Sequence, residues 1–219
     1  MAKRITILAG HYGSGKTNIA VNFALEMAQS GKKVSVADLD IVNPYFRTKD
    51  SAEDFEKAGI RLISSEYANT NVDIPALPQE MYAVVDDRDC HFVLDIGGDD
   101  RGALALGRLT PAILQENDYE MLLVANFYRP LTRDTASLLE VMKEMEVASG
   151  ITFTGVINNS NLGEITTAED VLVSVEKAKA FCKEASLPLV MTTVKQELLP
   201  DLSGRIENLY PLTLQRKYY

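Results

Sequence analysis

Short apolar runs alternate with amphipathic stretches along the whole chain. Several of the runs end at a glycine or an aspartate, as buried strands of a parallel sheet do. The stretches between them repeat apolar positions at helical spacing. The pattern predicts strands at residues 4–9, 34–38, 60–63, 91–96, 120–125, 152–157 and 188–194, and helices at 16–30, 46–58, 79–87, 101–115, 134–149 and 167–185.

This alternation predicts an α/β fold with three layers, in which a mostly parallel sheet is covered by helices on both faces. The length of 219 residues and the apolar content of 46% fit one domain spanning residues 1–219. Pro111 is a weak point inside the predicted helix 101–115. Ligands of such sheets bind at the carboxyl ends of the strands, so the candidate residues are sought there.

The most specific motif is G-x-x-x-x-G-K-T, which is typical of a phosphate-binding loop. It comprises Gly10, His11, Tyr12, Gly13, Ser14, Gly15, Lys16 and Thr17. Glycines let successive amide groups face a phosphate, and the helix that follows adds the positive end of its dipole. Lys16 is expected to reach the β- and γ-phosphates, and the Thr17 hydroxyl to bind Mg²⁺. The loop therefore predicts a site for a nucleoside triphosphate with magnesium.

Acidic residues follow two of the predicted strands. Asp38 ends the strand 34–38, Asp40 follows it, and Asp95 closes the run 91–96. Mg²⁺ prefers hard oxygen ligands, so Asp38 and Asp95 are predicted to hold the metal directly or through water. Asp40 is predicted to orient a water toward the γ-phosphorus, with Lys16 as its catalytic companion. The alternative is that Asp38 or Asp40 only caps the next element.

Two further segments are candidates for movement or recognition. Gly97 and Gly98 directly follow Asp95, and a γ-phosphate can order such a turn, which would make it a switch. Asp99 and Asp100 have the alternative role of helix caps. The stretch 64–78 shows no periodicity, and it is either a specificity or partner loop or a plain surface connection.

Charge and composition exclude several classes of function. The net charge of −9 disfavours general nucleic-acid or membrane-surface binding. No long apolar stretch predicts a membrane span, so a cytoplasmic location is expected. Cys90 and Cys182 are expected to be core thiols rather than a disulfide or a metal pair. With only two histidines, zinc and iron–sulfur chemistry are disfavoured.

With these motifs assembled, the chain resembles the MinD/ParA group of P-loop ATPases, which includes the nitrogenase iron protein and, more distantly, the dethiobiotin and cobyrinate synthetases. The resemblance rests on the phosphate loop, on Asp38-Leu39-Asp40 with Pro44, on Asp95 with its glycine pair, and on residues 155–158. It implies ATP as the nucleotide and Asn158 as a contact of the adenine. The absence of a guanine-selecting N-K-x-D around Asn158 also favours ATP over GTP.

One departure from that family concerns the loop itself. The family has an extra lysine at the position of His11, which reaches across an ATP-bound dimer, and a glycine at the position of Tyr12. The resemblance implies a homodimer, but a neutral imidazole does not replace a permanent cation, so His11 is not expected to make this contact across the dimer. His11 either contacts the ligand by stacking or hydrogen bonding, or is an exposed loop residue without a role.

Other family features are also missing. The cysteines that hold the iron protein's cluster are absent, and the tail 204–219 has no amphipathic basic helix, so electron transfer and membrane anchoring are not expected. Arg47, Arg129 and Arg133 follow predicted strand ends. Each is either a contact for phosphate or a substrate acid, or a solvated surface arginine.

Three functions fit these observations. The favoured one is a magnesium-dependent ATPase that converts ATP to ADP and acts as a nucleotide-driven switch for a protein partner. The second is an ATP-dependent ligase or kinase acting on a small acid, with the segment 64–78 in its substrate site. The third is a nucleotide-binding interaction module without catalysis.

Overall fold

A single parallel sheet organises the part of the chain that the structure, a computed structural model, describes, namely residues 3–39, 48–64, 79–98 and 100–214. Within these ranges its strands run in the order β3-β2-β4-β1-β5-β6-β7-β8, and every neighbouring pair is parallel. The strands are β1 Ile5–Ala9, β2 Val34–Leu39, β3 Arg61–Ser64, β4 His91–Ile96, β5 Tyr119–Ala125, β6 Gly155–Asn158, β7 Leu189–Lys195 and β8 Leu209–Leu212.

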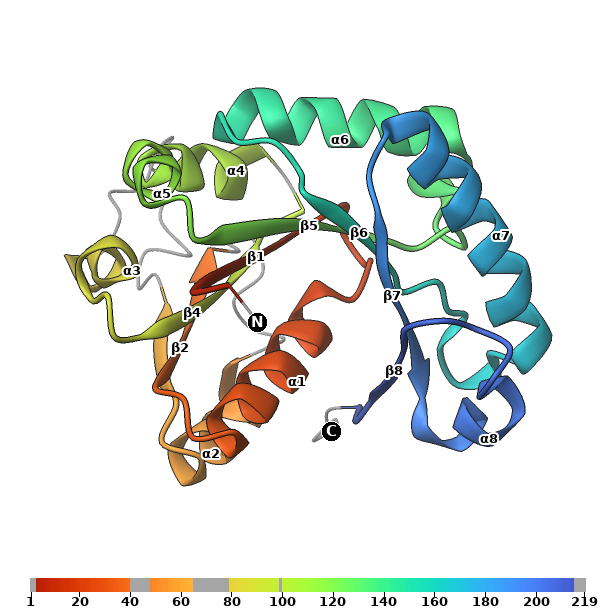
Figure 1. The fold of residues 1–219 in the computed structure, drawn as a ribbon, viewed down its shortest axis with the longest axis horizontal. Helices are drawn as coiled ribbons and strands as arrows, with labels where there is room; N and C mark the ends of the chain where they lie inside the picture. The colour runs from red at the N-terminus through yellow and green to blue at the C-terminus, as the bar shows by residue number, and fades with distance from the viewer. Residues whose placement is uncertain (1–2, 40–47, 65–78, 99, 215–219) are drawn as a thin grey trace.

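Helices cover both faces of this sheet (Figure 1). The α-helices are α1 Lys16–Gln29, α2 Thr48–Lys57, α3 Ala83–Asp86, α4 Asp100–Gly107, α5 Thr110–Glu116, α6 Thr135–Ser149, α7 Ala168–Ala185 and α8 Leu199–Leu202. Short 3-10 turns are η2 Gln79–Tyr82, η3 Pro130–Thr132, η4 Gly163–Ile165 and η5 Gln196–Leu198. None of the helices in the described ranges is long and apolar enough to span a membrane.

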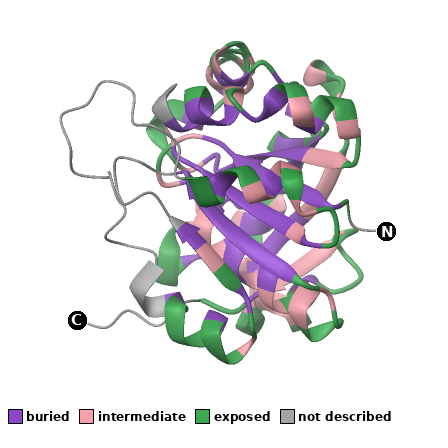
Figure 2. Cartoon of the chain, turned by 90° about the vertical axis from the view of Figure 1, so that its left-hand side faces the viewer, coloured by how far each residue is buried: buried purple, intermediate pink, exposed green. Residues whose placement is uncertain are grey.

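Alternation along β1 shows how the layers are divided. Ile5 and Ile7 pack in the cluster that contains Leu106 of α4 and Phe181 of α7, whereas Leu8 packs with Ile19 of α1. Successive side chains of a strand point to opposite faces, so each face of the sheet has its own core. Figure 2 shows the strands buried between these layers. The predicted three-layer α/β fold is confirmed.

Helix boundaries follow capping side chains. The Asp134 carboxylate accepts a hydrogen bond from the Ser137 amide at 2.9 Å, which starts α6. Thr167 and Asp170 form a reciprocal capping box at the start of α7. The predicted helices 134–149 and 167–185 therefore begin at their caps, one residue before the helical backbone.

The predicted helix 101–115 is two helices, α4 and α5. Pro111 lies in the first turn of α5, where its missing N–H leaves no hydrogen bond unmade. The Thr110 hydroxyl donates to the Ser149 carbonyl at 2.7 Å, which fixes the junction against the end of α6. The proline thus starts a second helix instead of weakening a single one.

The carboxyl-terminal strand β8 was not predicted. It pairs only with β7 among the described strands, so it forms an edge of the sheet. Pro211 lies within it, and a proline inside an apolar run argues against a strand unless that strand is at an edge. Its position explains why the sequence pattern gave no signal here.

A buried arginine, Arg4, lies at the amino-terminal end of β1, opposite the end that carries the phosphate loop. Arg4 donates from Nη1 to the carbonyls of Asp87 and Cys90, both at 3.1 Å, and from Nη2 to the Val84 carbonyl at 2.9 Å. Its guanidinium also forms an ion pair with Glu116 at the end of α5. The hydrogen bond from Arg4 lowers the pKa of Glu116 below its ordinary value.

We expect Glu116→Gln to lower the free energy of unfolding at pH 7 by about 2 kcal/mol, because a buried guanidinium loses its charged partner. A carboxyl with a lowered pKa stabilises the fold above its unfolded pKa of about 4.3, and this contribution is lost as the pH falls through the folded value. Urea unfolding of both proteins from pH 7 to pH 3 therefore gives curves that converge in acid. A difference that stays constant with pH would contradict the ion pair's role.

Candidate functional site

The phosphate-loop residues 10–17 form the turn between β1 and α1. Gly15 has a φ of 90°, in the left-handed region that favours glycine. Gly10 lies against β5, where an added Cβ would be 2.5 Å from the Val124 carbonyl oxygen. Both glycines are therefore required by the path of the loop.

Lys16 is buried beneath this loop, with 1% of its surface exposed. Its Nζ donates to the Gly10 carbonyl at 2.8 Å and to the His11 carbonyl at 3.3 Å. An ammonium group is buried only where acceptors compensate its lost hydration. The loop is thus folded around the lysine that the motif predicts as its phosphate ligand.

The predicted metal residues meet beside the loop. The Thr17 hydroxyl donates to the Asp95 carboxylate, and Asp38 is the register partner of Asp95 on the neighbouring strand. Both carboxylates are buried. A hydroxyl and two carboxylates are hard oxygen donors, so this set fits a magnesium ion. Asp40, the predicted catalytic acid, lies outside the described residues.

Asn159, which directly follows β6, holds the phosphate loop by a hydrogen bond. Its Nδ2 donates to the Ser14 carbonyl at 2.6 Å, and its Oδ1 accepts a hydrogen bond from the Thr193 hydroxyl. An added Cβ on Gly15 would overlap this amide nitrogen. The Ser14 hydroxyl itself is buried and has no hydrogen-bond partner in the described part of the chain.

Sequence reasoning missed the role of Asn159, since 145 positions separate it from Ser14. The only available signal was the polar run that ends the strand 152–157. Asn158, which the resemblance assigns to adenine, is fully buried, and its Nδ2 donates to the Ser174 hydroxyl at 2.9 Å. A contact between Asn158 and the base stays a prediction.

The turn after β4 packs directly on the phosphate loop. An added Cβ on Gly98 would be 2.7 Å from the Cα of Tyr12 and 3.0 Å from the carbonyl carbon of His11. Next to it, an added Cβ on Gly102 of α4 would be 2.9 Å from the Leu39 carbonyl oxygen at the end of β2. The loop, the turn and the start of α4 therefore meet backbone to backbone.

His11 and Tyr12, the two loop residues that depart from the expected family pattern, differ in exposure. The Tyr12 side chain is 59% exposed, and the Nδ1 of His11 lies 3.1 Å from the Tyr12 carbonyl oxygen. Tyr12 is therefore exposed, whereas His11 is half-buried.

The three candidate arginines have different surroundings. Arg129 donates from Nε to the Gly13 carbonyl at 3.1 Å, so it lies against the phosphate loop. Arg133 is exposed, and its Nε lies 3.6 Å from the Asp134 carboxylate. Arg47 and the predicted recognition segment, apart from Ser64, lie outside the described residues.

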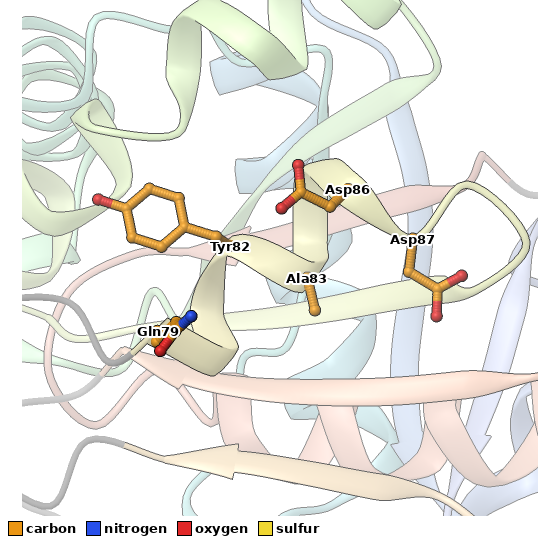
Figure 3. A pocket seen from close by; sticks show the side chains of 5 residues that line it. All are labelled: Gln79, Tyr82, Ala83, Asp86 and Asp87. Atoms are coloured by element: carbon orange, nitrogen blue, oxygen red, sulfur yellow. The ribbon is translucent and has the colours of Figure 1, made fainter.

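Other chemistry has no comparable support in the described part of the chain. A hollow beside α3 is lined by Gln79, Tyr82, Ala83, Asp86 and Asp87, and Figure 3 shows Tyr82 pointing away from the two aspartates. Cys90 and Cys182 are buried free thiols, and burial raises the pKa of Cys182 to about 11. No group of three His, Cys, Asp or Glu side chains that could hold a metal ion occurs in the described ranges.

We expect Asn159→Ala to lower the free energy of unfolding by about 2 kcal/mol, because the buried Ser14 carbonyl loses its donor. The amides of residues 13–16 should then exchange with solvent faster, as measured by hydrogen exchange. Thr193→Val removes the bonds of the Thr193 hydroxyl to Asn159 Oδ1 and to the Asn158 carbonyl but leaves the donor to Ser14 in place, so it serves as the control with a smaller effect on the loop. Unchanged exchange in Asn159→Ala would mean that the loop holds its shape without this bond.

Solved structures with a similar fold are distant in sequence. Cell division protein FtsY from Thermotoga maritima has 18% identity and a TM-score of 0.58, over 88% of this chain and 62% of that one. FlhF complexed with GTP and Mg²⁺ has 17% identity and a TM-score of 0.57, over 90% and 68%. This chain thus spans less than two thirds of the FtsY structure.

A nucleotide-binding protein from Archaeoglobus fulgidus in complex with ADP matches this chain over most of the length of both proteins. It has 15% identity and a TM-score of 0.53, over 94% of this chain and 90% of that one. At these identities the similarity shows the fold alone. No curated protein sequence matches the chain.

The family comparison is more specific than the fold. Residues 5–175 match the CobQ/CobB/MinD/ParA nucleotide binding domain, and this range contains the phosphate loop, Asp38, Asp95 and Asn159. The match covers well over half of the chain. The chain therefore belongs to the CobQ/CobB/MinD/ParA family of nucleotide-binding domains.

Proposed function

We propose that this protein binds ATP with Mg²⁺, hydrolyses it, and uses the difference between the ATP and ADP states as a switch for a protein partner in the cytoplasm. The observation that carries this proposal is the meeting of the Thr17 hydroxyl with the Asp95 carboxylate, next to the buried Lys16. An ammonium group, a hydroxyl and a carboxylate, supplied by α1 and β4, come together there as parts of a phosphate and metal site.

Each residue has a defined task in this proposal. The loop amides and Lys16 bind the β- and γ-phosphates, while Thr17, Asp38 and Asp95 hold the metal ion. When bound, magnesium neutralises charge on the phosphate oxygens. Asp40 orients the attacking water, and the loop excludes bulk water from the reacting phosphate.

ATP is proposed over GTP because the segment after β6 lacks the N-K-x-D pattern that selects guanine. Asn159, the first residue after β6, donates to the loop through Nδ2, and the residues behind it are Ser160 and Asn161. No carboxylate occupies this segment to accept the two N–H donors of a guanine edge.

The contact between Gly98 and the loop supports the switch. A γ-phosphate brings charge and volume to the loop surface on which the turn 97–98 now packs. The turn continues into α4, and Gly102 of that helix touches the end of β2. Leu104 of α4 is 50% exposed, so this helix offers an apolar side chain to a partner.

We expect Lys16→Ala to weaken MgATP binding by at least about 100-fold, because charge-assisted hydrogen bonds to phosphate are lost. Thr17→Ala should reduce the gain in affinity that Mg²⁺ gives over EDTA, since one metal ligand is missing. Calorimetric titration measures both effects. Lys179→Ala, which removes an exposed lysine paired with Glu176, is the control. Equal affinities in Lys16→Ala and the wild type would exclude this phosphate site.

We expect Gly98→Ala to uncouple the turn from the nucleotide, because its methyl group overlaps the backbone of Tyr12. It should lower the free energy of unfolding by about 1–3 kcal/mol. Hydrogen exchange of residues 97–107 should change on MgATP addition in the wild type and much less in the variant. Gly107→Ala, at the end of the following helix α4 with its added Cβ 3.4 Å from the Ala148 oxygen, is the control.

Hydrogen exchange, together with an assay of ATP turnover, separates the switch from other uses of the site. A nucleotide-dependent change that survives in Gly98→Ala would contradict this coupling. Turnover of ATP that appears only when a small carboxylic acid is supplied would instead identify a ligase or kinase. Binding without any turnover would identify a non-catalytic module.

A further inference from the structure

We propose that Arg129 is a second cationic ligand for the bound phosphates, supplied by the same chain as Lys16. This inference rests on the proposed nucleotide binding and adds a residue from outside the phosphate-loop motif. Arg129 lies in the connection between β5 and η3, more than 110 positions after Gly13.

The backbone that carries Arg129 is held in place by a buried asparagine. The Arg129 amide donates to the Asn126 carbonyl at 3.1 Å, and the Thr132 hydroxyl donates to the same oxygen at 2.6 Å. The Tyr128 amide donates to the Asn126 side-chain oxygen at 3.0 Å. The turn after β5 is therefore built before any ligand arrives, which fixes where the side chain begins.

The side chain of Arg129 lies flat on the phosphate loop. Besides the hydrogen bond from Nε to the Gly13 carbonyl, a Cβ placed on Gly13 would be 3.5 Å from Nε, 3.8 Å from Cζ and 4.0 Å from Cδ. These are ordinary van der Waals distances, so the guanidinium packs against Gly13. The loop thus provides both a hydrogen-bond acceptor and a packing surface for this arginine.

The guanidinium keeps its remaining donors available. Nε has the only hydrogen bond of this side chain to the described residues, and no carboxylate among them lies within ion-pair distance. Arginine carries five N–H donors in a planar fork that matches two phosphate oxygens. In a chain with a net charge of −9, a guanidinium without a carboxylate partner beside an anion-binding loop is placed for a phosphate.

Arg133 shows that this arrangement is specific to Arg129. It follows only four positions later and is also exposed, but its Nε lies near the Asp134 carboxylate instead of the loop. The two arginines therefore have the same charge and a similar exposure, and they differ in contact with the phosphate loop. This makes Arg133 the matched control.

The test is calorimetric titration of the full chain and three variants, Arg129→Ala, Arg129→Lys and Arg133→Ala, with MgATP and with magnesium tripolyphosphate, which has no nucleoside. We expect Arg129→Ala to weaken both ligands by about tenfold, as the loss of one charge-assisted hydrogen bond does. Arg129→Lys should recover part of this loss, and Arg133→Ala should stay within about twofold of the wild type. Thermal unfolding checks that each variant is folded.

Two results would overturn the proposal. Arg129→Ala with wild-type affinity for both ligands would show that the arginine is only a support of the loop. A loss for MgATP but not for tripolyphosphate would place Arg129 on the nucleoside. If the wild type bound neither ligand, the proposed nucleotide site itself would fail, and this outcome is distinct from both.

Discussion

The burial of the Lys16 ammonium beneath its own loop is the constraint on which the rest of the site depends. A positive charge with almost no contact with water must be surrounded by oxygen atoms, and the Gly10 and His11 carbonyls turn inward to supply them. Each peptide plane then directs its other side outward. The shape of the anion site is therefore a consequence of solvating one lysine.

The parallel sheet turns this local arrangement into a complete site. Because all strands run the same way, the ends of β2, β4, β5 and β6 lie along one edge, next to the loop after β1. Asp38 and Asp95 come to this edge from one side, and Asn126 and Asn159 come to it from the other. The two carboxylates lie together on one side of the loop, while Asn159 on the other side holds the loop through its hydrogen bond to Ser14.

The sequence predicted the features that depend on neighbouring residues along the chain. Apolar runs predicted seven strands, and the glycine spacing predicted the phosphate loop. The position of Asp95 at the end of a buried run predicted a carboxylate beside that loop. Contacts between distant segments gave no such signal. Two such contacts are the hydrogen bonds from Asn159 to Ser14 and from Arg129 to Gly13. Both depend on how the strands pair, which no single stretch of sequence encodes. The junction between α4 and α5 was missed for a similar reason, since it rests on Ser149 of α6.

The edge strand β8 bears on how copies of this protein can meet. An exposed edge is a template on which another chain can add a strand, but Pro211 removes one N–H donor from β8. The same strand is held inward, because Tyr210 donates to Glu26 and the Thr213 amide donates to Asn22, both on α1. Lateral growth of the sheet into a fibre is thus discouraged at this edge, which leaves β3 as the other edge strand of the described sheet.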